Sequence, residues 1–226
     1  MVSIVSLQGV VALLGRFPAL AGADLEVGES EIVLVQGPNG AGKSTLLRVC
    51  AGLLRIESGR AEVLGHDLVA DRAAVRRSVG LLGHDTALYD DLTVEENLRF
   101  WARASRIDDE AVPAALDRLG VADRLRDVAV RNLSAGQRRR TALAAVVVRR
   151  PRLWLLDEPH SGLDQGGRDL IDQVILDAAS AGATVMLASH ELDRTLDLAP
   201  RHLTVAGGTI TSDERGSREP GGHDAA

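Results

Sequence analysis

A glycine-rich run at residues 37–44 carries the groups needed to hold phosphate. It has the P-loop pattern, in which backbone N–H groups turn toward phosphate oxygens, a lysine reaches the β- and γ-phosphates and a hydroxyl ligates Mg²⁺. A glycine-rich turn that only caps a helix is the alternative, but it needs no lysine followed by two hydroxyl residues. Of the run, Lys43 is also a catalytic candidate and Ser44 a magnesium ligand. The expected nucleotide-binding residues are Gly37, Pro38, Asn39, Gly40, Ala41, Gly42, Lys43, Ser44 and Thr45.

Two adjacent acids follow an apolar run later in the chain. Residues 153–156 predict a buried strand that ends at Asp157 and Glu158, and ligands bind at the carboxyl ends of strands in open parallel sheets. Because neighbouring side chains on a strand point to opposite sides, one acid can hold Mg²⁺ while the other polarises the attacking water. We assign Asp157 to magnesium and Glu158 to the general base. Two solvated acids at a strand end are the alternative, which the upstream phosphate loop disfavours.

The elements that must position these residues alternate between strand and helix patterns. Predicted strands cover residues 2–7, 24–27, 32–36, 153–156 and 184–188, and predicted helices begin near 43 and 192 and cover about 94–104, 110–119, 135–148 and 165–179. This order is typical of an α/β protein with a mostly parallel core sheet. We expect one domain over residues 1–211, with an inserted helical lobe at about 85–148. Residues 212–226 are expected to form a flexible polar tail, because they contain almost no apolar side chains.

Composition narrows the classes of function. The chain has 226 residues, of which 45% are hydrophobic, enough for one sizeable core. Its net charge of −6 gives no overall attraction to nucleic acid, so we expect no such partner and expect the arginines at 138–140 to be solvated or paired with acids. The single cysteine, Cys50, lies in an apolar helical run and is expected to fill the core. The longest apolar run, residues 142–148, is far too short to span a membrane.

Three further segments resemble motifs of the ABC ATPases. Residues 133–137, Leu-Ser-Ala-Gly-Gln, resemble the ABC signature sequence; residues 161–164 resemble the D-loop; and His190, after the strand at 184–188, resembles the switch histidine. With the phosphate loop and the two acids, five motifs stand in the order found in that family. The resemblance covers about residues 2–210. It implies the P-loop NTPase (ABC ATPase) fold, with an N-terminal antiparallel β portion beside the parallel core.

The same resemblance implies how the site is completed. Ser134, Gly136 and Gln137 would contact the γ-phosphate held by a second ATP-binding subunit in a head-to-tail dimer, and Ser134 is also expected to cap its helix. His190 would bond the γ-phosphate and position water against Glu158, although a lone histidine is more often an ordinary core or surface residue. The implied activity is hydrolysis of ATP with Mg²⁺, coupled to membrane-spanning subunits on separate chains. The implied location is peripheral, at the cytoplasmic face of the cell membrane.

Two positions depart from the family pattern. His84 stands where ABC ATPases usually carry a glutamine in the loop that joins the sheet to the helical lobe. A neutral imidazole can still meet a metal-bound water, so His84 is kept as a candidate at the metal. The usual adenine-stacking aromatic is replaced by Leu14-Gly15, and Phe17 is the only ring nearby. Phe17 either stacks on adenine or fills the core, and both alternatives stay open.

Within the family, several segments are similar to the ATPase of cytochrome c maturation haem exporters. They are the pair Gly83-His84, residues 92–98, the signature at 133–137 and the pair Leu153-Trp154, together with the compact length. The ATPase of another small exporter is one alternative. A soluble ABC ATPase acting in translation or DNA repair is another, disfavoured because the chain has one cassette and no heptad run. A scaffold that binds ATP without hydrolysis is disfavoured by the full set of candidate catalytic residues.

Overall fold

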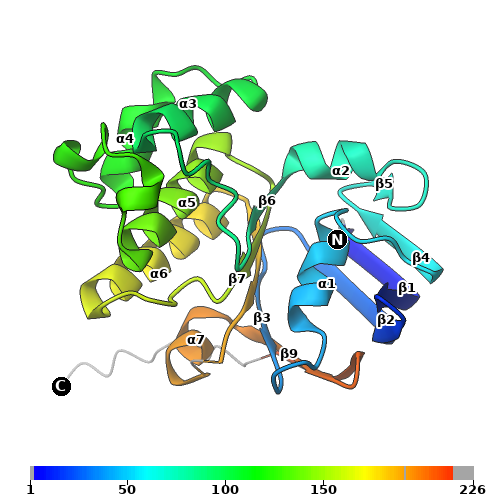
Figure 1. Cartoon of the computed structure of the whole chain (residues 1–226). Coiled ribbons are helices and arrows are strands. Elements are labelled where there is room, and N and C mark those ends of the chain that lie inside the picture. Colours follow the sequence, from blue (N-terminus) through cyan, green and yellow to red (C-terminus); the bar gives the residue numbers. More distant parts are fainter. Residues whose placement is uncertain (1–2, 191, 216–226) are drawn as a thin grey trace, which may run out of the picture.

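Two sheets make up the framework of the protein (Figure 1). The computed structural model describes residues 3–190 and 192–215. The antiparallel N-terminal sheet has the order β2-β1-β4-β5, with β1 at Ser3–Leu14, β2 at Phe17–Gly28, β4 at Ser58–Val63 and β5 at His66–Asp67. The core sheet has the order β10-β9-β3-β8-β7-β6, with β10 at Thr209–Arg215, β9 at Arg201–Ala206, β3 at Ile32–Gln36, β8 at Thr184–Ala188, β7 at Leu153–Asp157 and β6 at Val79–Leu82. Its strands are parallel except for β10, which confirms the predicted fold class.

The helices divide the described part of the chain into two lobes. They are α1 (Lys43–Cys50), α2 (Arg72–Ser78), α3 (Val94–Ala104), α4 (Ala111–Arg118), α5 (Ala135–Arg149), α6 (Gln165–Ser180) and α7 (Leu192–Leu198), with short 3₁₀ turns at Asp123–Leu125 and Val130–Asn132. Helices α3, α4 and α5 lie in the predicted helical lobe, apart from the N-terminal sheet (Figure 1). Within the described residues, no helix is both long and apolar enough to cross a membrane.

Alternate residues of the core strands belong to two hydrophobic clusters, one on each face of the sheet. On β3, Val33 and Val35 face a cluster that contains α1 and the N-terminal sheet, whereas Ile32 and Leu34 face the helical lobe and α6. Every residue of β7 and β8 is buried, because both faces of a parallel sheet are covered. Cys50 is fully buried, as predicted, and burial raises the pKa of its thiol to about 12.

The N-terminal strands are longer than the sequence pattern indicated. Gln8 and Gly9 interrupt the apolar run of β1, yet the strand continues through them as a bulge, with a shift of register between Leu7 and Val10. Gly9 adopts a φ of +57°, and its N–H donates to Asp24 Oδ1 at 2.8 Å. A β-bulge places one unpaired residue in a strand without ending it, so the polar interruption does not mark a strand end.

The flexible tail predicted from residue 212 overlaps with strand β10. Residues 212–215 lie in β10, an edge strand that pairs antiparallel with β9. Asp213 accepts hydrogen bonds from Arg201 at 2.7 and 2.8 Å, and Arg201, only 5% exposed, also contacts Glu31 at 2.5 Å. The assignment of 212–215 to a tail was therefore wrong, because charged residues are common on edge strands and composition alone does not separate the two cases. The rest of the predicted tail, 216–226, lies outside the described residues.

Replacing Asp213 by Asn is expected to lower the free energy of unfolding by about 1 kcal/mol at pH 7, because buried Arg201 loses a charged acceptor. The stabilisation that this pair contributes is modest because Asp213 is partly exposed to water. Hydrogen bonding to Arg201 lowers the pKa of Asp213 below its ordinary value of 3.8. The stabilisation is therefore present above that pH and is lost as the pH falls through the lowered pKa.

Urea unfolding of the wild type and the variant, at pH 7 and in acid, measures this difference. Glu214→Gln serves as the control, because Glu214 is the exposed neighbour of Asp213 on β10. Equal losses in the two variants, or a loss for Asp213→Asn that persists in strong acid, would contradict the role given to the Arg201 pair.

Candidate functional site

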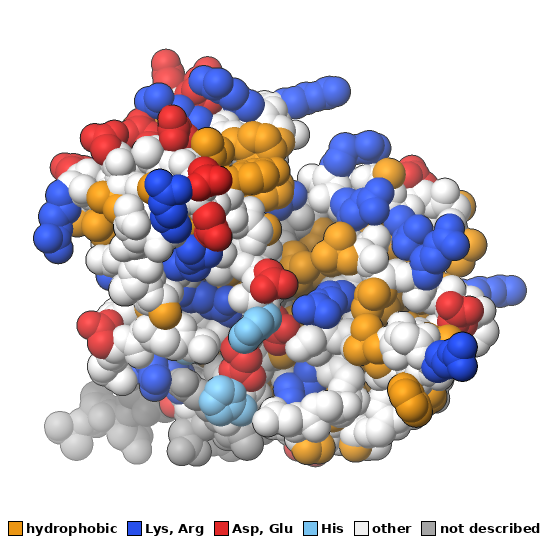
Figure 2. Space-filling view, in the orientation of Figure 1, with side chains coloured by type: hydrophobic (Ala, Val, Ile, Leu, Met, Phe, Trp, Pro, Cys, Tyr) orange, Lys and Arg blue, Asp and Glu red, His pale blue; other side chains and the backbone are white. Residues whose placement is uncertain are grey.

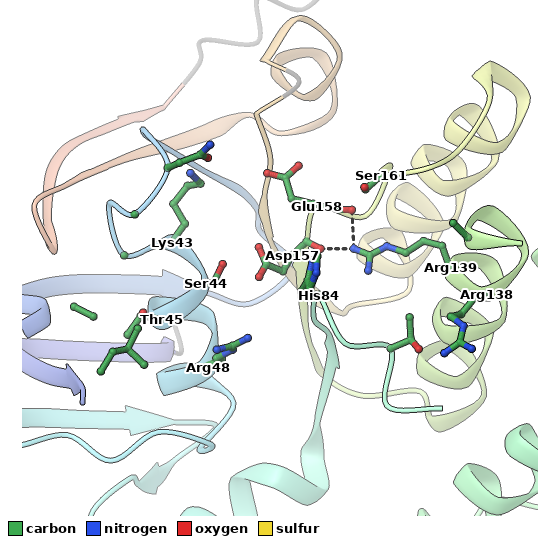
Figure 3. Close-up of a pocket in the computed structure, with 17 residues that line it drawn as sticks. Lys43, Ser44, Thr45, Arg48, His84, Arg138, Arg139, Asp157, Glu158 and Ser161 are labelled. Carbon is green, nitrogen blue, oxygen red and sulfur yellow. Dashed lines mark hydrogen bonds between the residues drawn. The ribbon is translucent and has the colours of Figure 1, made fainter. Parts of the chain in front are cut away.

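A cleft of about 560 Å³ lies where the predicted site residues converge (Figure 3). The loop between β3 and α1 lines it with Asn39, Gly40 and Gly42, and the first turn of α1 lines it with Lys43, Ser44 and Thr45. The end of β7 contributes the two acids, and the loop after β6 contributes His84. The remaining loop candidates, Gly37, Pro38 and Ala41, shape the loop without being among the lining residues. The structure therefore brings together the phosphate loop, the acid pair and the histidine loop that the sequence singled out separately.

The phosphate loop needs glycine at two positions because the chain passes close to other backbone there. Gly37 has a φ of +140°, and a Cβ atom on it would lie 2.1 Å from the carbonyl oxygen of Val205. Gly42 has a φ of +114°, and its Cβ would lie 2.5 Å from the carbonyl oxygen of Ala19. Both contacts are far inside van der Waals distance. Strands β9 and β2 thus press the loop into the shape in which its N–H groups can face a phosphate.

Lys43 is the first residue of α1, and its side chain bonds back to the loop before it. The side chain is buried, and Nζ donates to the carbonyl oxygens of Gly37 at 2.7 Å and Pro38 at 3.1 Å. An ammonium group has three N–H donors, so these bonds hold the cation in place and leave one donor for a phosphate oxygen. Ser44 follows at the start of α1 and lines the same cleft.

The two acids take different environments at the end of β7. Asp157 is buried in the strand and pairs in register with Ala188 of β8. Glu158 leaves the strand with a left-handed backbone, φ +52°, although its N–H still donates to the carbonyl oxygen of Ala188 at 2.8 Å. A non-glycine residue in this region costs about 1–3 kcal/mol and often marks a functional position. This turn aims the side chain of Glu158 into the cleft.

His190 contacts Glu158, which lines the cleft. The Nδ1 atom of His190 lies 2.8 Å from Oε2 of Glu158. The two residues come from neighbouring strand ends, because β8 pairs with β7 and ends at Ala188. Both side chains keep solvent contact, 68% exposed for His190 and 31% for Glu158, so a water molecule and a nucleotide can reach them.

The predicted signature segment begins α5 as expected. Ser134 caps the helix by accepting from the N–H of Gln137, and the N–H of Ser134 donates to Oε1 of Gln137 at 2.9 Å. This reciprocal pair is a capping box. A Cβ atom on Gly136 would lie 2.9 Å from the carbonyl oxygen of Gly162, so the segment packs tightly on the predicted D-loop. Ala135 lines the cleft, whereas Ser134, Gly136 and Gln137 are not among its lining residues.

The two departures from the family pattern have different outcomes. His84 is exposed and lines the cleft with Asp157, so its proposed place near the metal stays a prediction. Phe17 is 80% exposed at the start of β2, so the alternative that it fills the core was wrong. Its hairpin turns through Gly15, φ +62°, and leaves the ring outside the packed sheet. Adenine stacking by Phe17 stays a prediction, and Leu14 and Ala19 are the hairpin residues that line the cleft.

Comparison with known proteins decides the family. A family model described as ABC transporter matches residues 20–161, which is more than half of the chain. The chain belongs to the ABC transporter family. Among curated relatives of this ABC protein, the daunorubicin resistance ATP-binding protein of Streptomyces coeruleorubidus is 38% identical, over 92% of this chain and 67% of that protein. The cytochrome c biogenesis ATP-binding export protein of Cupriavidus pinatubonensis is 40% identical, over 79% of each chain.

Solved structures agree with the fold of the ABC protein. A dimeric ATP-binding cassette in a post-hydrolysis state, bound to ADP and Pi, superposes with a TM-score of 0.87 over 93% of this chain and 98% of that one, at 23% sequence identity. An ATP-binding subunit of an ABC transporter gives the same TM-score at 22% identity. Together with the family match, the protein is an ABC-type ATP-binding subunit, and its enzymatic activity is hydrolysis of ATP.

Sequence reasoning missed Arg139 in this ABC ATPase. The residue was expected to be solvated or paired with acids, but it is only 7% exposed and bonds backbone carbonyl oxygens instead. Its guanidinium donates to the carbonyl oxygen of Gly83 at 2.7 Å. It also donates to the carbonyl oxygens of Glu158, at 2.6 Å, and of Asp157 (Figure 3). Burial lowers the pKa of Arg139, and the carboxylates of Asp157 and Glu158 oppose that shift. One side chain of α5 thus holds the ends of both β6 and β7.

Helical spacing is the signal that could have found Arg139. Buried residues of α5 recur three, four and seven positions later, at Ala142, Leu143 and Val146, so Arg139 starts the apolar stripe of the helix. Arg138 and Arg140 lie off this stripe. Arg138 pairs with Asp90 at 2.7 Å, as the expectation of acid pairing predicted, and Arg140 donates to the carbonyl oxygen of Gly120.

Substituting Arg139 by Lys is expected to reduce kcat for ATP about tenfold, because an ammonium cannot reach the separate carbonyl oxygens that the planar guanidinium spans. Arg140→Lys is the control, since Arg140 donates to one carbonyl oxygen on the outside of the helix. Steady-state phosphate release measures both variants. Equal kcat values for the two lysine variants would show that Arg139 does not position the acids.

Proposed function

We propose that this ABC ATPase is the motor of an exporter, in which two ATP-binding subunits drive separate membrane-spanning subunits. The observation that carries the catalytic part is the convergence of Lys43, Asp157 and Glu158 on one cleft, with His190 2.8 Å from Glu158. The same four residues argue against a scaffold that only binds ATP. ATP would lie with its phosphates on the loop before α1.

The residues present fit a magnesium ion. Ser44 and buried Asp157 line the same cleft, and hydroxyl and carboxylate oxygens are the hard ligands that Mg²⁺ takes beside nucleotide phosphates. When bound, Mg²⁺ would neutralise charge on the β- and γ-phosphates. His84 borders the cleft as well and would meet the metal only through a water molecule. The assignments of Ser44, Asp157 and His84 to the metal therefore stay part of the proposal.

Hydrolysis then needs three actions from the chain. Glu158 accepts a proton from water as the water oxygen bonds to the γ-phosphorus. The bond from that phosphorus to the bridging oxygen of ADP breaks, and Lys43 offsets the negative charge that develops on the phosphates. His190, held against Glu158, would donate to a γ-phosphate oxygen and keep the water in line. ADP and inorganic phosphate are the products.

A second subunit would complete the site by presenting its signature segment. Ser134, Gly136 and Gln137 begin α5 but are not lining residues of the cleft in their own chain, and the N-terminus of a helix attracts anions. A head-to-tail pair with two-fold symmetry would place each α5 start on the γ-phosphate of its partner. The dimeric cassette that this chain superposes on supports such a pairing at the level of the fold.

Glu158→Gln should trap this dimer, because the amide keeps the size and hydrogen bonding of the side chain but cannot take the proton from water. ATP turnover should fall by at least a hundredfold while ATP binding persists. Adding Ser134→Arg should then abolish the dimer, since the obstruction lies on the face given to the partner. Light scattering with and without ATP gives the mass of each variant.

The monomer of the double variant must still bind ATP, which a fluorescent ATP analogue can verify. Ala129→Arg, a change in the same segment before the signature, is the matched control and should leave the dimer intact. A dimer that survives Ser134→Arg would contradict the shared site directly.

An exposed aromatic cluster supports a protein partner for the helical lobe. The chain has two Trp, one Tyr and two Phe residues, and three of these pack together: Tyr89 and Phe100 with ring centroids 4.8 Å apart, and Phe100 and Trp101 at 5.4 Å. Tyr89 is 49% and Phe100 41% exposed. Figure 2 shows hydrophobic side chains gathered on this lobe, on the side nearer the other lobe. Exposed apolar patches of this kind mark interaction sites, and we assign this one to the membrane-spanning subunit.

The identity of the exported compound is the most specific element of the proposal. Relatives named for cytochrome c biogenesis export support haem export in cytochrome c maturation, and the match covers 79% of both chains. A drug exporter is the second candidate, because the daunorubicin resistance relative is 38% identical over 92% of this chain. The motor residues act on ATP in either case, so the membrane partner would decide the compound.

Isolation of the intact complex from detergent extracts should separate these candidates. The chain is expected to capture a membrane protein, and the complex is expected to show the visible absorption of haem. Phe100→Ser should lose the capture, whereas Val69→Ser, which removes an apolar side chain that is 70% exposed elsewhere, should keep it. A captured complex without haem would refute haem export, and a soluble partner in its place would refute the transport motor.

A further inference from the structure

A buried histidine follows the two acids and has no role in the chemistry described so far. His160 is 1% exposed and lies two residues after Glu158, at the head of the predicted D-loop. Its Nε2 lies 2.7 Å from Oδ1 of Asp172 on α6. A carboxylate only accepts hydrogen bonds, so Nε2 carries the proton and donates it.

The other ring nitrogen shows what this side chain is for. Nδ1 of His160 is buried and, among the described residues, has no hydrogen-bond partner. A buried polar atom without a partner destabilises a fold, so an apolar residue of similar size would serve packing better. The bond from Nε2 to Asp172 is therefore the feature that distinguishes histidine at this position.

Asp172 passes the connection on to another helix. Its second oxygen, Oδ2, accepts from Nη1 of Arg194, and Nη2 of Arg194 donates to Asp169 at 2.7 Å. Arg194 belongs to α7, which begins at Leu192. Hydrogen bonding to Asp169 and then the charge of Asp172 raise the pKa of Arg194, so the guanidinium is a fixed cation between two carboxylates.

These contacts connect the segment that follows Glu158 with the segment that contains His190. His190 precedes α7 by two residues, and its Nδ1 lies 2.8 Å from Oε2 of Glu158. The chain after Glu158 is thus tied to the chain around His190 twice, once through the exposed contact of these two side chains and once through His160, Asp172 and Arg194. The second connection is buried at its histidine end and charged along its length.

We propose that His160 is a positioning residue for ATP hydrolysis: through Asp172 and Arg194 it holds the loop after Glu158 against α7, and so keeps His190 in place beside Glu158. The inference rests on the roles proposed for Glu158 and His190. Without the Nε2 bond, Arg194 would stay paired with Asp169 and Asp172 of α6. The loop that follows Glu158 would then lose its connection to both α6 and α7. Binding of ATP to the phosphate loop does not involve this connection.

Four variants test the proposal by their kcat and KM for ATP and by their thermal midpoints. His160→Leu should lower kcat about tenfold and change KM less than about twofold. His160→Gln should keep kcat close to the wild-type value, because the Gln amide nitrogen can donate from near the position of Nε2. Arg194→Met should match His160→Leu, and the double variant should be no slower than the slower single variant, since both remove one connection.

Arg201→Met is the matched structural control, because Arg201 is, like Arg194, an arginine held between carboxylates but is not among the residues that line the cleft. It should lower the thermal midpoint and keep kcat. If kcat follows the thermal midpoint in all these variants, Arg201→Met included, His160 serves the fold alone and the proposal is overturned. Wild-type kcat in His160→Leu overturns it as well.

Glu158→Gln, measured in parallel, separates this inference from the proposed catalytic roles. If Glu158→Gln is inactive and His160→Leu has wild-type kcat, only the positioning role falls. If Glu158→Gln hydrolyses ATP at the wild-type rate, the assigned base is wrong and the positioning role falls with it.

Discussion

The register of three parallel strands is the constraint on which the site depends. Val35 of β3 and Asp157 of β7 both pair with Ala188 of β8, so the three strands end at one edge of the sheet. Parallel strands present their carboxyl ends together, and each of these ends leads into a functional segment: the phosphate loop, the acid pair and the loop to His190. A slip of one residue in any strand would turn its side chains to the other face and separate the groups.

The ends of these strands are held by contacts that come from elsewhere. Arg139 reaches from α5 to the carbonyl oxygens at the ends of β6 and β7, and His160 ties the following loop to α6 and, through Asp172, to α7. A buried charge such as that of Arg139 is costly unless it is hydrogen-bonded, and the bonds of Arg139 hold the two strand ends in one arrangement. The helical lobe and the core sheet are thus joined at the cleft itself. A movement of one relative to the other would shift the position of Glu158.

Much of the fold and of the candidate site followed from local patterns. The glycine-rich loop, the apolar strand before Asp157 and the cap at Ser134 each depend on residues close in the chain, and each lies where the pattern predicted. Edge elements were harder to predict. Strand β10 carries polar residues because one side of it faces water, and β1 continues through a bulge at Gly9; in both cases pairing with a neighbouring strand overrides the local composition.

By itself the sequence determined the class of chemistry, because phosphate binding and water activation require particular residue types at short spacings: the loop that ends in Lys43 and Ser44, and the adjacent acids. Only the tertiary structure decided which distant groups act together. The contact of His190 with Glu158, the carbonyl oxygens around Arg139 and the connection from His160 to Arg194 join residues 12 to 56 positions apart. No spacing rule encodes such contacts, because they arise from strand register and helix packing over the whole core.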